Sequence, residues 1–226
     1  MTATQCEPPP TQGVFFDLDG TLIDTAPDMG GALNRMLAAH GRSPVHESAY
    51  RHLVSDGSRA LTRLGFGAPE DDAQQAERVA EFLRHYGDCL ADESCLFPGV
   101  AELLDQLDAL GLAIGIVTNK PGAFTEPLLQ KMGLRHRFAS VVSSDTLPKR
   151  KPDPDPIWHA ARESGVDAAA CLYVGDAERD IIAGNAAGMR TLAVEWGYFP
   201  AGTRLSDWQP DGVVSSPSAI VDWVVG

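Results

Sequence analysis

Two acidic residues separated by one position follow a short apolar run near the start of the chain. Residues 14–16 are all apolar and too few for a helix, so they predict a buried strand that ends at Asp17 and Asp19. A carboxylate at the end of a buried strand costs several kcal/mol, roughly, unless a metal ion or another cation compensates its charge. Gly20 and Thr21 follow as a turn residue and a small hydroxyl. The pattern therefore indicates a chemical site at the end of this strand.

Polar side chains also follow other predicted strands. A second strand ends in Thr118 and Asn119, small donors that suit phosphoryl oxygens, and a later strand ends just before Asp176, with Asp180 one helical turn further on. In an open α/β sheet, ligands bind outside the carboxyl ends of the strands. We therefore expect these residues to share one crevice with Asp17.

A lysine in a stiff loop is the candidate cation for this crevice. The chain has only four lysines, and Lys151 begins the motif Lys-Pro-Asp-Pro. The two prolines restrict the backbone and so restrict where the ammonium group points. We therefore predict Lys151, rather than the neighbouring Lys149, as the site lysine.

In this order, these motifs resemble the four signatures of the haloacid dehalogenase superfamily, in its phosphatase branch. The resemblance implies that Asp17 is the nucleophile and forms an aspartyl-phosphate, while Asp19 is the general acid and base. Lys151 would offset the charge on Asp17 and on the phosphoryl group. Thr118 matches the family's hydroxyl position, and Asn119 follows it as in many phosphatases of the family.

The resemblance also implies a metal cofactor. Asp17, Asp176 and the backbone carbonyl of Asp19 would hold Mg²⁺, because hard oxygen ligands suit this ion better than zinc. Asp180 would hold Lys151 or a metal-bound water.

The elements that must position these residues are predicted to form an α/β fold. From residue 98 onward, strands and helices alternate, which predicts a Rossmann-like parallel sheet with helices on both faces. Residues 26–97 show helical periodicity without a strand signal, beginning after Thr25 as a helix cap, and resemble the inserted helical cap domain of the family. We therefore expect a disordered tail over 1–12, a catalytic core over 13–25 and 98–226, and an all-helical cap over 26–97.

The amino-acid composition limits the classes of partner that the protein is expected to bind. The net charge of −13 and the isoelectric point of about 4.7 argue against nucleic acid or an anionic membrane as a partner. The start of the chain lacks the pattern of a signal peptide, and the cysteines lack Cys-x-x-Cys spacing, which favours free thiols. We expect a cytoplasmic protein, a monomer or weak homodimer, that acts on a small phosphorylated metabolite.

The cap is expected to select the substrate. Its loop over residues 54–61 resembles that of phosphoglycolate phosphatases, which makes Gly57 and Arg59 candidate substrate-binding residues. A small phosphate ester with a carboxylate needs a second cation besides Lys151, and this cap contains no lysine, so we assign that task to Arg59. The alternative is that Arg59 is only a solvated arginine at a helix start.

Hydrolysis of 2-phosphoglycolate is the expected function, and three others are alternatives to it. Trp196-Gly197-Tyr198 and the position of Asp153 are compatible with hydrolysis of N-acetylmuramic acid 6-phosphate, which is the alternative to 2-phosphoglycolate. A mutase resembling β-phosphoglucomutase would use a cap lysine, which is missing here. A non-catalytic binding protein would typically have lost the nucleophile or the metal acid, and both are present.

Overall fold

A parallel sheet of six strands forms the centre of the molecule. The structure is a computed structural model that describes residues 10–225. The strand order is β5-β4-β1-β6-β7-β8, so that β1 lies between β4 and β6, and all pairs are parallel. This confirms the predicted α/β class. The strands are β1 (Gly13–Phe16), β4 (Ala113–Val117), β5 (Ser140–Val142), β6 (Cys171–Gly175), β7 (Arg190–Val194) and β8 (Gly212–Val214).

Helices cover both faces of this sheet. Successive side chains of β1 point to opposite faces, and because these side chains are apolar, both faces must be covered. Val14 and Phe16 belong to one apolar cluster, while Phe15 between them belongs to another. The first cluster includes residues of α5, α6 and α9, and the second includes residues of α7 and α8. The helices are α5 (Val100–Ala109), α6 (Gly122–Lys131), α7 (Asp155–Glu163), α8 (Glu178–Ala187) and α9 (Ala219–Val225), with short 3₁₀ turns at Arg135–Arg137, Ala168–Ala170 and Leu205–Trp208.

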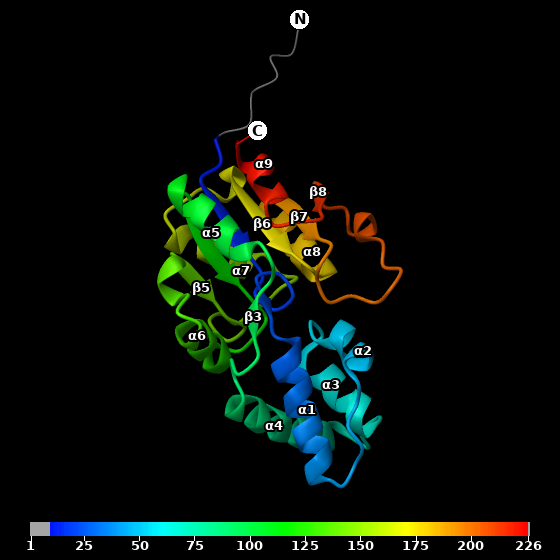
Figure 1. Cartoon of the computed structure of the whole chain (residues 1–226). Coiled ribbons are helices and arrows are strands. Elements are labelled where there is room, and N and C mark those ends of the chain that lie inside the picture. The colour runs from blue at the N-terminus through cyan, green and yellow to red at the C-terminus, as the bar shows by residue number, and fades with distance from the viewer. Residues whose placement is uncertain (1–9, 226) are drawn as a thin grey trace, which may run out of the picture.

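A second group of helices lies at one end of the molecule, at the bottom of Figure 1, while α9 lies at the opposite end. Leu33, Leu37, Leu61 and Phe82 are fully buried in this group. We call this group the cap. Its elements are α1 (Ala26–Ala39), α2 (Glu47–Tyr50), a 3₁₀ turn at Arg51–Leu53, α3 (Gly57–Phe66) and α4 (Asp72–Asp88).

The chain passes between sheet and cap twice, at adjacent points. β2 (Ile23–Asp24) and β3 (Cys95–Leu96) pair in antiparallel fashion there. The buried Asp28 of α1 accepts hydrogen bonds from the backbone of Glu93 and Ser94 beside them. β3 corrects the expectation that residues 26–97 are purely helical. No local pattern could predict this strand, because its two residues are a strand only through pairing with β2, where the chain enters and leaves the cap.

Two local predictions were wrong. Thr25 precedes α1, but its hydroxyl does not cap the helix and instead donates to Asp19. The expected tail ended at Gln12, yet Gln12 donates its backbone N–H to Ala170 and accepts from Ala113, which extends the β1 pairing by one residue. The rest of the expected tail, residues 1–9, lies outside the described residues. Among residues 10–225, no helix has the length and apolar character that a membrane span requires.

Candidate active site

Asp17, at the end of β1, lies beside a buried lysine. The Nζ atom of Lys151 is 2.9 Å from Oδ1 of Asp17 and 2.6 Å from Oδ1 of Asp180, and it also donates to the hydroxyl of Tyr173. The Lys151 side chain is 1% exposed. Burial alone lowers the pKa of Lys151, but Asp17 and Asp180 outweigh burial and hold the pKa above its ordinary value. Lys151 is therefore a permanent cation next to Asp17.

The loop before α7 fixes this lysine. The peptide bond between Lys151 and Pro152 is cis, and the side-chain amide of Asn119 donates to the carbonyl oxygen of Lys151 at 2.9 Å. By contrast, Lys149 is exposed and pairs with Asp153 and Asp155. The structure thus brings Lys151, and not Lys149, to Asp17.

Asp176, directly after β6, completes a buried acidic cluster. Ligand atoms of Asp17, Asp176 and Asp180 lie within 4.8 Å of one another. Burial, followed by the charges of Asp17 and Asp180, raises the pKa of Asp176 to about 8. Asp176 accepts hydrogen bonds from the backbone N–H of Tyr198 and from the hydroxyl of Ser55 in the cap. Such a crowded set of carboxylates favours an additional cation.

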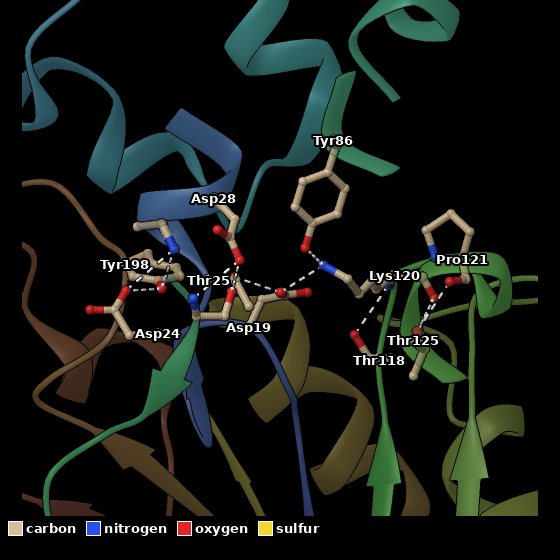
Figure 2. A network of polar contacts seen from close by, with 12 residues as sticks. Asp19, Asp24, Thr25, Asp28, Tyr86, Thr118, Lys120, Pro121, Thr125 and Tyr198 are labelled. Atoms are coloured by element: carbon tan, nitrogen blue, oxygen red, sulfur yellow. Dashed lines mark hydrogen bonds and ion pairs between the residues drawn. The ribbon is translucent and has the colours of Figure 1, made fainter. Parts of the chain in front are cut away.

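Asp19 lies in a second polar network, shown in Figure 2. Its Oδ1 atom accepts from the hydroxyl of Thr25 at 2.6 Å and from Nζ of Lys120 at 2.9 Å. Lys120 also donates to the hydroxyl of Tyr86 in α4 of the cap. Burial alone lowers the pKa of Lys120, but Asp19 and Tyr86 outweigh it and raise the pKa above its ordinary value. The cap and the core therefore meet at the second aspartate of the motif.

A cavity of about 490 Å³ lies between sheet and cap above these residues. Asp17, Asp19 and Lys151 line it, as do Thr118 and Asn119 at the end of β4. The predicted residues from distant parts of the core therefore meet in one place, while their individual roles stay predictions. Asp176 and Asp180 are fully buried and are not among the residues that line the cavity.

The cap loop before α3 forms the opposite wall. Gly57 and Arg59 both line the cavity. Gly57 has a φ of +75°, a conformation that glycine adopts without strain. Arg179 of α8 donates to the carbonyl oxygen of Ser55 and lies 3.6 Å from Asp56, which holds this loop against the core. Arg179 of the core therefore holds the cap loop in place over the cavity.

Several residues of this site were not predicted from the sequence. Lys120 directly follows Thr118-Asn119 at a strand end, which was a usable signal for its role. Lys120 and Arg179 both line the cavity. Arg59 is therefore not the only candidate for a second cation, because two cations of the core lie at the same cavity, and its role stays a prediction. Ser55 and Tyr86 gave no signal, since only the folded cap brings them to the core.

Comparison with known proteins identifies the family. The family model described as haloacid dehalogenase-like hydrolase matches residues 14–194. An N-acetylmuramic acid 6-phosphate phosphatase of Pseudomonas aeruginosa is 39% identical over 211 residues, with 93% of each chain covered. A phosphoglycolate phosphatase of Xanthomonas campestris pv. campestris is 43% identical over 206 residues, covering 91% of this chain and 93% of the relative.

A solved structure agrees with this result. The crystal structure of a predicted phosphoglycolate phosphatase from Haemophilus somnus 129PT has a TM-score of 0.83 and 26% identity, covering 94% of this chain and 97% of that chain. With its signatures gathered at one cavity between sheet and cap, the chain belongs to the haloacid dehalogenase-like hydrolase family.

Proposed function

We propose that this hydrolase cleaves phosphomonoesters through an aspartyl-phosphate on Asp17. The observation that supports it best is the pairing of Asp17 with the buried Lys151 at the floor of the cavity, 2.9 Å apart. This arrangement pairs the nucleophile with a cation and places that cation where a phosphoryl group would carry negative charge. Relatives named as phosphatases cover more than nine-tenths of this chain, which supports the same reaction class.

The proposed reaction has two steps, transfer of the phosphoryl group to Asp17 and its hydrolysis by water. A carboxylate oxygen of Asp17 attacks phosphorus, the bond from phosphorus to the ester oxygen breaks, and that oxygen keeps the electron pair and takes a proton from Asp19. A water oxygen then attacks phosphorus and gives a proton to Asp19, while the bond between phosphorus and Asp17 breaks. Phosphate and the free alcohol leave, and both aspartates return to their starting states. One acid–base residue therefore serves both steps.

The acidic cluster fits a divalent cation. Of the three buried carboxylates, only Asp17 and Asp180 contact the Lys151 ammonium group, and Oδ1 of Asp17 receives no hydrogen bond from any described residue besides this ionic contact. We propose that Asp17, Asp176 and the backbone carbonyl of Asp19 hold Mg²⁺, with Asp180 positioning Lys151. When bound, the ion would neutralise charge on the phosphoryl group and orient it toward Asp17.

The size of the cavity bears on the substrate. Cavities of about 300–1,000 Å³ enclose drug-sized ligands, so a two-carbon acid such as 2-phosphoglycolate would fill only part of the 490 Å³ here. Part of the cavity wall is apolar, which suits the acetamido methyl group of an acetamido sugar. We therefore propose N-acetylmuramic acid 6-phosphate as the substrate that fits best, and 2-phosphoglycolate as the second candidate; one relative is named for each of these substrates. The apolar residues are Met29, Val54, Val79, Leu83 and Phe124.

A substitution that narrows the cavity separates these two substrates. Val79 lines the cavity from α4, so Val79→Trp should lower kcat/KM for N-acetylmuramic acid 6-phosphate about tenfold or more, which corresponds to about 1.4 kcal/mol. Hydrolysis of 2-phosphoglycolate should change by less than about threefold. Steady-state kinetics with both esters is the measurement. Wild-type preference for 2-phosphoglycolate, or equal losses for both, would assign the cavity to the smaller ester.

Arg59 is expected to recognise a carboxylate, which both candidate substrates carry. Arg59→Ala should lower kcat/KM for both about 10- to 100-fold, because charge-assisted pairs contribute about 1.5–3 kcal/mol. Glucose 6-phosphate lacks a carboxylate and should be hydrolysed by the variant as by the wild type. The matched control is Arg63→Ala in the same helix, since Arg63 instead contacts Gln75. Equal losses on glucose 6-phosphate would show that Arg59 does not read the carboxylate.

A further inference from the structure

Lys120 is a buried cation that the two-step reaction above does not use. It is 8% exposed, and its Nζ atom lies 2.9 Å from Oδ1 of Asp19 and 2.7 Å from the hydroxyl oxygen of Tyr86. Figure 2 shows the ammonium group between these two residues. Burying a lysine is unfavourable unless its charge is paired, so this position is specified by its partners.

The backbone of Lys120 is held as firmly as its side chain. Its N–H donates to the hydroxyl of Thr118, and its carbonyl accepts from the N–H of Ser144 and the hydroxyl of Thr125. The lysine therefore extends from a fixed point at the end of β4. Its ammonium group can set the position of Asp19 because it is itself anchored.

The two donors to Asp19 act on the same oxygen. Lys120 and Thr25 both donate to Oδ1, whereas no described residue donates to Oδ2. The Asp19 side chain is 14% exposed and lines the cavity. With Oδ1 pinned, Oδ2 is the oxygen left to exchange a proton with the substrate.

Tyr86 links this arrangement to the cap. It belongs to α4, it is 2% exposed, its ring packs against Phe124 of the core, and the Lys120 ammonium group lies 4.6 Å from the centre of that ring. The hydroxyl oxygen is available to Lys120 only while the cap occupies this position. If the cap moves away, Lys120 loses one of its two side-chain partners.

We propose, on the premise that the chain is the phosphatase described above, that Lys120 and Tyr86 are positioning residues for the general acid Asp19. Lys120 pins Oδ1 so that Oδ2 faces the leaving oxygen, and Tyr86 makes this orientation depend on a seated cap. Protonation of the leaving group is therefore coupled to closure over the substrate. A purely structural ion pair would instead stabilise the fold without selecting one step of the reaction.

The dependence on leaving group distinguishes these two roles. An alkyl phosphate needs a proton on its leaving oxygen, whereas 2,4-dinitrophenyl phosphate releases a stable anion without one. Both esters share the second step, so the comparison uses kcat/KM, which reports transfer of the phosphoryl group to Asp17. For Lys120→Met we expect kcat/KM on glucose 6-phosphate to fall about 100-fold, within the usual contribution of general acid catalysis, and kcat/KM on the dinitrophenyl ester to fall less than about threefold. Lys120→Arg should recover part of the loss, because it restores a cation that can donate to Oδ1.

Tyr86→Phe keeps the ring and removes only the hydroxyl, so it tests the same point if Lys120→Met fails to fold. We expect about a tenfold loss in kcat/KM on glucose 6-phosphate and none on the dinitrophenyl ester. Lys131→Met is the matched control, because Lys131 also links the core to the cap side by donating to the carbonyl of Leu90 without reaching Asp19. It should leave both esters unchanged.

Equal losses on the two esters in Lys120→Met and Tyr86→Phe would overturn the positioning role. Asp19→Asn serves as the reference for the proposed function, since it should show the largest difference between the esters. A wild type without activity on either ester, or an Asp19→Asn variant without that difference, would contradict the phosphatase mechanism itself. The two failures are therefore distinguishable.

Discussion

Asp17→Asn is expected to abolish turnover of every phosphomonoester, with a loss on the order of 10⁴-fold or more, as for other catalytic nucleophiles. An amide oxygen cannot attack phosphorus to give a stable acyl phosphate, and no other carboxylate points from the same position. The fold should persist, because the substitution removes one of three buried negative charges and Asp180 still pairs with Lys151.

The measurement is hydrolysis of p-nitrophenyl phosphate with added Mg²⁺, alongside thermal unfolding of both proteins. Asp17→Asn should show no burst of product and an unfolding temperature close to that of the wild type. Near-normal activity in a freshly prepared variant would contradict the covalent mechanism.

Lys151→Met is expected to have the largest effect on stability. It leaves Asp17 and Asp180 buried without their cation, and removing one partner of a buried ion pair costs about 3–5 kcal/mol. Turnover should also be lost, since the cation beside the nucleophile is gone. Urea unfolding is the measurement. Lys149→Met is the matched control, because Lys149 is solvated, and it should leave both the free energy of unfolding and turnover nearly unchanged.

The loss of stability in Lys151→Met should depend on pH. Burial raises the pKa of Asp180 and Lys151 opposes that rise, so the pKa rises further without the lysine. A carboxyl group whose pKa is higher in the folded state binds protons more readily there, and folding is then favoured as pH falls. The difference from the wild type should therefore be larger at neutral pH than below the raised pKa. A deficit that is constant over this range would show that Asp180 is not left uncompensated.

The parts of the fold that follow from local pattern could be predicted. α7 and α8 lie where alternating strands and helices were expected, because prolines or acidic residues mark their starts and apolar spacing marks their buried faces. The meeting of Asp17, Lys151 and Asp176 followed from the rule that the carboxyl ends of parallel strands share one edge. Their proximity was thus predictable, although their roles stay predictions.

Features that depend on tertiary contacts could not be predicted. β2 and β3 are too short to give a periodic signal, and they exist only as a pair. Thr25 has the sequence context of a helix cap, yet Asp19 takes its hydroxyl, because a charged acceptor competes well with the backbone. The contact between Tyr86 and Lys120 joins residues on separate structural units, and no local pattern encodes it.

The central place of β1 has a consequence for how the chain folds during synthesis. Gly13 at the start of β1 pairs with Ala113 on one side and Cys171 on the other, so the strand that bears the nucleophile leaves the ribosome long before either neighbour is made. The cap helices form one continuous stretch and contact one another, so they can fold before the strands that pair with β1 are synthesised. Contacts between distant residues form late because long loops are costly to close. A nascent chain therefore completes its hydrolytic centre late, after most of the protein has been translated.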